Sequence, residues 1–174
     1  MNSDNKSLFD YDRALLRDKP YFNRLQIAIV VSRQHQSITN KLYRACYNTL
    51  IEYDVSKGNI STTYAPGAFE LPICANMIAE KKTLFSEETR VGAFICIGCV
   101  IKGETNHNEY ISMSVANALQ NLAIKWSTPF IFGVITSDSK EQAEARAGGK
   151  HGNKGVEAAK AALYTGIRTM WTEL

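Results

Sequence analysis

Residues 91–110 read VGAFICIGCVIKGETNHNEY, and this stretch decides the fold. Its first half, 91–101, is an apolar run that predicts a buried strand, and the polar turn 102–105 follows it. Apolar residues then recur at helical spacing, at Ile111, Val115, Ala118 or Leu119, and Leu122. Asn106 is followed three residues later by Glu109, which predicts a capping box at the helix start. The stretch is therefore read as a strand, a turn and a helix in succession.

The turn between this strand and this helix suits an anion. A helix N-terminus presents unpaired backbone N–H groups and a partial positive charge, which together attract phosphate. His107 lies in the first helical turn, where its imidazole can face the same crevice. The plainer interpretation is a capped helix with a solvated histidine, and this stretch alone does not decide between the two.

The same succession of strand and helix recurs along the chain. Short apolar runs predict further strands at 25–31, 60–64 and 129–136. Helical spacing of apolar residues predicts helices at 38–53, 72–82, 107–125, 139–147 and 156–171. Strands that alternate with helices and are mostly apolar predict a parallel sheet covered on both faces. The expected fold class is therefore α/β, a three-layer α/β/α sandwich around a four-stranded parallel sheet with right-handed crossovers.

Polar and glycine-rich loops follow the carboxyl ends of the predicted strands, at 32–37, 65–70, 102–107 and 136–139. In open parallel sheets, ligands bind in the crevice outside the carboxyl ends of the strands. The topology therefore predicts a ligand site formed by these four loops.

Length and composition indicate one globular domain of 174 residues, 45% of them hydrophobic. We expect a polar N-terminal tail at 1–24 and a single domain at 25–174; the cluster 19–22 within the tail could dock on another surface. The net charge of +3 gives no reason to expect a nucleic-acid partner, and no apolar run is long enough for a membrane helix. The first residues have no apolar core of a secretory signal.

The four cysteines do not indicate a redox or metal site. Cys96 and Cys99 form a C-x-x-C, but they lie in a predicted strand and no second pair accompanies them. We interpret both as small core residues with reduced thiols, which predicts a cytoplasmic protein.

Four segments, taken together, resemble the 6,7-dimethyl-8-ribityllumazine synthase family. They are Pro66-Gly-Ala-Phe-Glu-Leu-Pro72, Gly98-x-Val-Ile-Lys-Gly-Glu-Thr-x-His107, Pro129-Phe-Ile-Phe-Gly-Val-Ile-Thr136 and Arg146-Ala-Gly-Gly-Lys-His-Gly-Asn-Lys-Gly155. The resemblance implies a flavodoxin-like fold, assembly into at least a pentamer, and active sites at subunit interfaces. It implies condensation of 5-amino-6-(D-ribitylamino)uracil with 3,4-dihydroxy-2-butanone 4-phosphate, with release of phosphate and water. This reaction is the penultimate step of riboflavin biosynthesis, and no metal, nucleotide or flavin cofactor is implied.

The resemblance also implies roles for individual residues. His107 would carry protons, and Arg146 would bind the butanone phosphate together with Gly103, Glu104 and Thr105. The ribityl chain and pyrimidine would be held by Ala68, Phe69 and Glu70. The ring pocket would be lined by Cys99, Val100 and Ile101. The adjacent subunit would contribute Phe132, Arg146 and Lys154.

The sequence departs from the family's pattern in the loop after the first strand. Gln34 stands where the family has an aromatic residue that stacks on the pyrimidine, so either its amide lies flat on the ring or His35 partly substitutes. Ala145 stands where a glutamate is frequent, and Cys99 where threonine or serine is common. A non-catalytic protein that binds flavin or lumazine is the alternative function, and another flavodoxin-like domain for a phosphorylated ligand is a further one.

Overall fold

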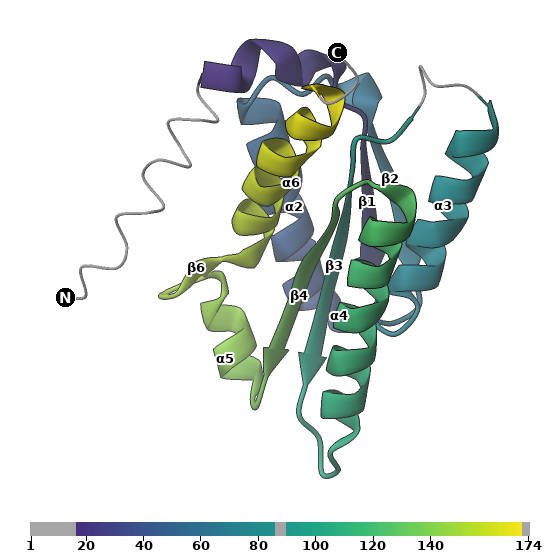
Figure 1. The fold of residues 1–174 in the computed structure, drawn as a ribbon. Coiled ribbons are helices and arrows are strands. Elements are labelled where there is room, and N and C mark those ends of the chain that lie inside the picture. Colours follow the sequence, from purple (N-terminus) through teal and green to yellow (C-terminus); the bar gives the residue numbers. More distant parts are fainter. Residues whose placement is uncertain (1–16, 86–89, 172–174) are drawn as a thin grey trace, which may run out of the picture.

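The computed structural model describes residues 17–85 and 90–171, and its centre is a parallel sheet (Figure 1). The strands lie in the order β2-β1-β3-β4. Their bounds are β1 (Ile27–Ser32), β2 (Ile60–Ala65), β3 (Ala93–Ile101) and β4 (Phe130–Ser137). The α-helices are α2 (Gln36–Glu52), α3 (Leu71–Phe85), α4 (His107–Trp126), α5 (Lys140–Ala145) and α6 (Lys154–Trp171). The predicted α/β class and its four-stranded parallel sheet are confirmed, and each element lies within a few residues of its predicted place.

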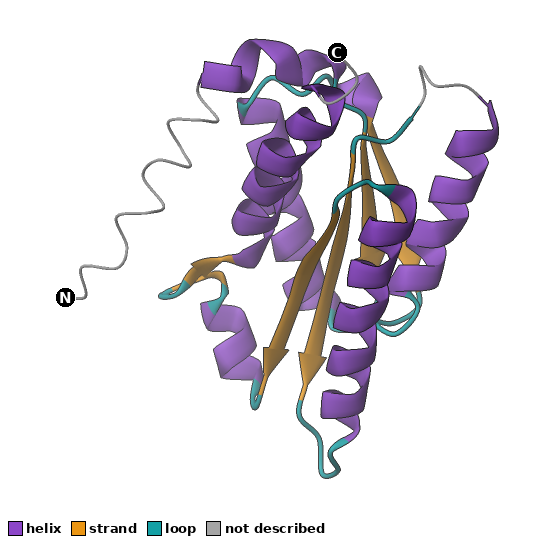
Figure 2. Ribbon diagram, viewed as in Figure 1, coloured by secondary structure: helices purple, strands orange, loops and turns teal. Residues whose placement is uncertain are grey.

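Helices cover both faces of the sheet, with α2 and α6 on one side and α3 and α4 on the other (Figure 2). Alternate side chains of a strand point to opposite faces. In β1, Ile27, Ile29 and Val31 therefore pack into the core beneath α2 and α6, whereas Ala28 and Val30 pack beneath α3 and α4. The sandwich consequently has two apolar cores separated by the sheet.

The position of each strand in the sheet explains its composition. Strands β1 and β3 are paired on both sides and covered on both faces, so every residue of β1 and all but the last of β3 are buried. Strand β2 forms an edge and alternates between exposed and less exposed residues. The near-continuous apolar runs of the two central strands are therefore the sequence signal of a parallel sheet.

The residues just before β1 belong to the packed structure. Lys19–Arg24 forms the 3-10 helix η2, in which Phe22 is fully buried with its ring 6.3 Å from that of Tyr53. The cluster at 19–22 thus docks on this chain's own core through Phe22. Residues 1–16 lie outside the described part of the chain, so the expected tail at 1–24 is described only from residue 17.

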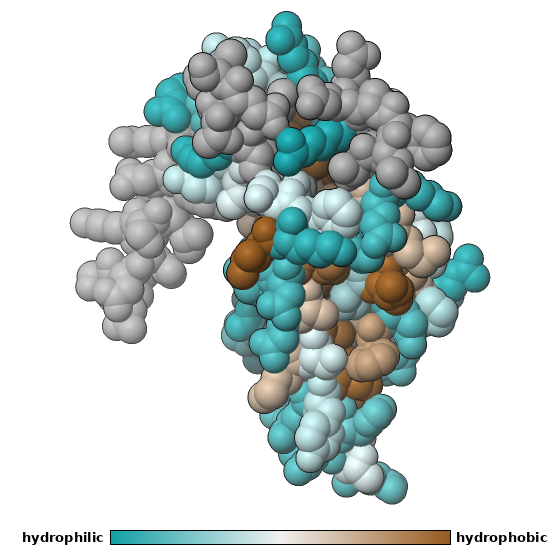
Figure 3. Space-filling view, turned by 45° about the vertical axis from the view of Figure 1, so that its right-hand side comes forward, coloured by the Kyte–Doolittle hydropathy of each residue, from teal (hydrophilic) through white to brown (hydrophobic). Residues whose placement is uncertain are grey.

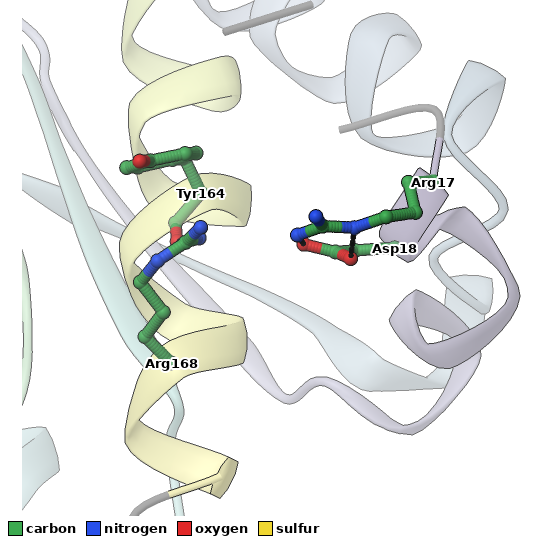
Figure 4. A network of polar contacts seen from close by, with 4 residues as sticks. All are labelled: Arg17, Asp18, Tyr164 and Arg168. Carbon is green, nitrogen blue, oxygen red and sulfur yellow. Dashed lines mark hydrogen bonds and ion pairs between the residues drawn. The ribbon is translucent and has the colours of Figure 1, made fainter. Parts of the chain in front are cut away.

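A polar contact lies beside η2. Arg17 Nε is 2.9 Å from Asp18 Oδ1, and Figure 4 shows this pair facing two residues of α6. The Arg168 guanidinium carbon lies 3.7 Å from the centre of the Tyr164 ring, and Arg168 Nη1 donates to the Tyr164 carbonyl at 2.7 Å. The start of the described chain and its last helix therefore meet at this end of the sandwich.

The glycine-rich loop before α6 forms a small hairpin that was not predicted. Its strands are β5 (Ala147–Gly149) and β6 (Gly152–Asn153), and both Gly148 and Gly152 adopt the positive φ that glycine tolerates. At the end of the hairpin, Gly155 lies so near α2 that a Cβ there would collide with the Leu42 carbonyl. The hairpin is thereby held between α5 and α6. No helix in the described ranges is long and apolar enough to cross a membrane.

Candidate active site

The carboxyl ends of the four strands lie at one edge of the sheet, as expected for a parallel sheet (Figure 1). From β1 the chain crosses to β2 on one side, while β3 and β4 lie on the other side. The strand order therefore reverses between β1 and β3, and a ligand crevice is expected outside this switch point. The loops after β1, β2 and β3 surround it.

Hydrogen bonds of its backbone amides hold the loop after β1 in place, and its side chains are exposed to solvent. The Arg33 amide donates to the Ala65 carbonyl at 2.8 Å, and the Gln34 amide donates to Ser32 Oγ at 3.1 Å. His35 takes up a left-handed backbone conformation with φ 54° as the chain enters α2. The side chains of Gln34 and His35 are both exposed at the crevice edge. This loop is therefore ordered by backbone contacts and leaves its polar side chains accessible.

The turn between β2 and α3 brings Glu70 to the loop after β1. The Gly67 amide donates to Glu70 Oε2 at 3.0 Å, and a Cβ built at Gly67 would lie 3.4 Å from Gln34 Oε1. Ala68 is buried, whereas Phe69 is 58% exposed. Gln34 and Glu70 therefore meet at one glycine, with the exposed Phe69 next in the chain to Glu70.

The end of β3 is mostly buried, whereas the turn that follows it is exposed. Cys99 and Val100 are buried and Ile101 is half-buried. Burial raises the pKa of the Cys99 thiol to about 11, so it stays neutral at physiological pH and is a poor nucleophile. The end of β3 is therefore apolar and carries no charge at physiological pH.

After the end of β3 the chain forms an exposed turn. Within the described chain, the amides of Gly103, Glu104 and Thr105 donate to no protein acceptor. His107 is exposed and is the first residue of α4. Asn106 is the N-cap as predicted, but its side chain makes no capping bond, so the predicted capping box is wrong. The free amides suit an anion at this helix start.

Arg146 lines a cleft of about 480 Å³ at the edge of β4. The helix α5 that precedes it begins as predicted at Ser139, whose hydroxyl accepts from the Gln142 amide. The cleft is lined by Thr136, Ser137, Glu141, Gln142, Ala145, Arg146, Lys150 and His151. No residue of the turn 102–107 lines it. The turn meets the cleft only at its edge, where the Lys102 amide donates to the Ser137 carbonyl at 2.9 Å.

Lys154 and Phe132 are the two other residues expected from the adjacent subunit. Lys154 lies near Arg146, and Phe132 lies in the core. The Lys154 amide donates to the Arg146 carbonyl at 2.9 Å, and Lys154 Nζ lies 3.0 Å from Glu157 Oε2. Phe132 is half-buried in the core beneath α3 and α4. Lys154 is thus partly neutralised by its neighbour in this arrangement.

Lys150 and His151 were not assigned a role from the sequence. The stretch 148–155 was recognised as a basic glycine-rich loop, but only its Lys154 was connected with the site. The hairpin turns Lys150 and His151 back onto the Arg146 cleft, and a hairpin this short gives no periodic sequence signal. Among residues 17–85 and 90–171, no cluster of three or more histidine, cysteine or acidic side chains is placed to hold a metal.

The fold and these loops define a doubly wound α/β domain with a crevice at the carboxyl ends of its strands. Residues 24–167 match the sequence model of the family 6,7-dimethyl-8-ribityllumazine synthase, and the chain belongs to this family. A protein of that name from Cytophaga hutchinsonii is 42% identical over 163 residues, which cover 94% of this chain and 96% of the relative. One from Porphyromonas gingivalis is 41% identical, covering 90% and 91%, and one from Coxiella burnetii is 41% identical, covering 79% and 87%.

Proposed function

We propose that this chain condenses 5-amino-6-(D-ribitylamino)uracil with 3,4-dihydroxy-2-butanone 4-phosphate to 6,7-dimethyl-8-ribityllumazine. The observation that carries the proposal is family membership over residues 24–167, with 42% identity to a named synthase across 94% of the chain. An amine of the uracil attacks the ketone to give an imine, phosphate is eliminated, and the second nitrogen closes the ring with loss of water. Because the substrate brings its own nucleophile, the protein has to position the reactants, move protons and neutralise phosphate.

The turn after β3 would hold the phosphate of the butanone substrate. The amides of Gly103, Glu104 and Thr105 have no protein acceptor within the described chain and lie at the N-terminus of the 20-residue helix α4, whose dipole favours an anion. Arg146 would complete this site, because its guanidinium can bind two phosphate oxygens at once. No described carboxylate lies within 4.0 Å of Arg146, so its charge is available for a ligand.

His107 would act as the proton carrier at the same turn. Imidazole exchanges protons near neutral pH, and this side chain is exposed beside the phosphate turn. General acid–base catalysis of this kind contributes roughly 10²–10⁴-fold. Its loss should therefore slow the reaction without abolishing it.

The uracil substrate would bind across the crevice between β1 and β3. Glu70 can accept hydrogen bonds from ribityl hydroxyls, and the buried Ala68 together with the backbone of Phe69 would form the wall beside it. The floor would be Cys99, Val100 and Ile101, and His35 and Gln34 would lie over the pyrimidine.

We further propose that the site is completed by a second copy of the chain, in an assembly of at least five subunits. The lining of the Arg146 cleft supports this, because it includes no residue of the 102–107 turn that would hold the same phosphate. An apolar exposed surface on the side of α3 and α4 also supports it, and Figure 3 shows brown side chains between polar ones on the side turned forward. Its exposed apolar residues are Ile73, Met77, Tyr110, Met113 and Ile124. The free thiols of the four cysteines fit a cytoplasmic location.

The proposed function is tested by mixing the purified chain with both substrates and following lumazine fluorescence. We expect a rate above the spontaneous one, a rate lowered on the order of 10²-fold in His107→Ala, and a raised KM for the butanone phosphate in Arg146→Ala. Lys57→Ala, an exposed residue at the opposite edge of the sheet, serves as the control. A wild-type rate equal to background would contradict the function and leave a binding protein. Full activity in both site variants would contradict the residue roles.

A further inference from the structure

The cleft at Arg146 contains two further basic side chains to which the sequence analysis assigned no role. Lys150 and His151 line it together with Arg146, and the acidic residue in the lining is Glu141. The wall from β4 contributes the hydroxyl groups of Thr136 and Ser137. The cleft is thus lined by charged groups from α5, from its C-terminus and from the hairpin tip.

Backbone contacts fix the hairpin tip against the end of α5. The His151 amide donates to the Ala145 carbonyl at 2.9 Å, and the Lys154 amide donates to the Arg146 carbonyl at 2.9 Å. Gly149 packs so closely that a Cβ there would lie 2.8 Å from Ala145 Cα. Lys150 and His151 therefore lie on a segment whose backbone is hydrogen-bonded to Ala145 and to Arg146.

The charges of the cleft show why Arg146 alone is a weak site for a dianion. Glu141 keeps its negative charge, because its own backbone N–H and the Ser139 hydroxyl lower the pKa of its carboxyl. No described carboxylate is within 4.0 Å of Arg146, but Glu141 lines the same cleft and lowers its net positive charge. Lys150 restores a net positive charge, and the imidazole of His151 adds a hydrogen-bond donor. The neighbouring lysines Lys140 and Lys154 each have a carboxylate within 4.0 Å, from Glu144 and Glu157, whereas no described carboxylate is that close to Lys150.

We propose that Lys150 and His151 bind the phosphate of the butanone substrate together with Arg146, Lys150 as a second cation and His151 as a further hydrogen-bond donor. This inference rests on the proposed function and deepens it, because it names two binding residues for the same phosphate. A phosphate monoester carries nearly two negative charges at neutral pH. Charge-assisted hydrogen bonds from two cations match that charge better than one arginine beside a carboxylate.

Anion binding tests the inference independently of turnover. Sulfate is the probe, because it stays dianionic over the pH range in which imidazole titrates, and its affinity for the full-length oligomer is measured by calorimetry. We expect about tenfold weaker sulfate binding in Lys150→Gln at neutral pH, the loss of one hydrogen bond to a charged group. Lys140→Gln, a lysine on α5 outside the cleft lining, should bind sulfate like the wild type. Unchanged sulfate affinity in Lys150→Gln would overturn the role of Lys150.

A second variant tests His151. His151→Gln should bind sulfate more weakly than the wild type at neutral pH, and Lys140→Gln again serves as the control outside the cleft lining. Unchanged sulfate affinity in His151→Gln would overturn the role of His151.

Kinetics distinguish failure of this inference from failure of the proposed function. In Lys150→Gln we expect the KM for the butanone phosphate to rise about tenfold with an unchanged KM for the uracil substrate. If the wild type makes lumazine and Lys150→Gln has the wild-type KM and sulfate affinity, only the inference fails. If the wild type makes no lumazine, the proposed function fails, and the sulfate titrations still decide whether Lys150 and His151 bind an anion.

Discussion

The side chains of Gln34 and Glu70 both approach Gly67, at the end of the crevice where we propose that the pyrimidine binds. The Gly67 amide holds one oxygen of Glu70 at 3.0 Å, and the Gln34 side-chain oxygen lies over the same glycine. An amide in this position can hydrogen-bond a planar ligand but offers less stacking area than an aromatic ring. The exposed Gln34 side chain leaves room for a larger one in its place.

Replacing Gln34 by an aromatic residue should tighten the pyrimidine site. We expect Gln34→Trp to lower the Kd of the uracil substrate or a lumazine analogue about two- to tenfold, because stacking contributes roughly 0.5–1.5 kcal/mol beyond burial. Fluorescence titration measures the Kd, and Gln120→Trp, at an exposed glutamine of α4, controls for unspecific gains. A Kd that is unchanged or higher in Gln34→Trp would count against a stacking position at residue 34.

At the scale of elements, the first turn of α6 and the hairpin before it decide where Arg146 and Lys154 lie. Helices α2 and α6 pack together along one face of the sheet, and Gly155 is the point of closest approach. Because the obstacle is the Leu42 carbonyl, a backbone atom within α2, a side chain at 155 cannot be accommodated by a rotamer change. The position of the hairpin therefore depends on this contact between helices.

Gly155→Ala should destabilise the protein by about 2 kcal/mol or more, since overpacking of this kind typically costs 1–3 kcal/mol. Urea unfolding measures the change in the free energy of unfolding. Gly58→Ala is the matched control, because nothing lies within 4 Å of a Cβ built there, and we expect a change within about 0.5 kcal/mol. Equal stabilities of the two variants would contradict the close packing of α6 on α2.

The four strands of the sheet and the α-helices were predictable from the sequence, whereas the hairpin β5–β6 and the 3-10 helix η2 were not. The apolar runs of β1 and β3 and the helical spacing in α4 gave the strands and helices, because burial on two faces or one leaves a periodic pattern. The hairpin β5–β6 has no such pattern, and Phe22 lies in a segment whose other residues are largely polar, so its burial depends on a distant partner, Tyr53. The capping box failed because Asn106 sits at the N-cap without using its side chain.

At the scale of the whole molecule, the turn after β3 and the Arg146 cleft lie at the ends of two neighbouring strands. The Lys102 amide donates to the carbonyl of Ser137, which lines the cleft, but no residue of 102–107 lines it. Sequence motifs could indicate both groups, since each is a local pattern, but how they meet around a ligand depends on folding and on assembly. The proposed assembly, in which each active site lies between two copies of the chain, is therefore a claim at this scale.

Mixed oligomers test this central claim most directly. His107→Ala and Arg146→Ala subunits are unfolded together, refolded as a mixture, and assayed for lumazine formation at limiting butanone phosphate. If each site takes His107 from one copy and Arg146 from the next, a random equal mixture should recover roughly a quarter of the wild-type rate, because about half of the subunits supply each intact group. A rate equal to the mean of the two separate variants would contradict shared sites and place both groups in one chain.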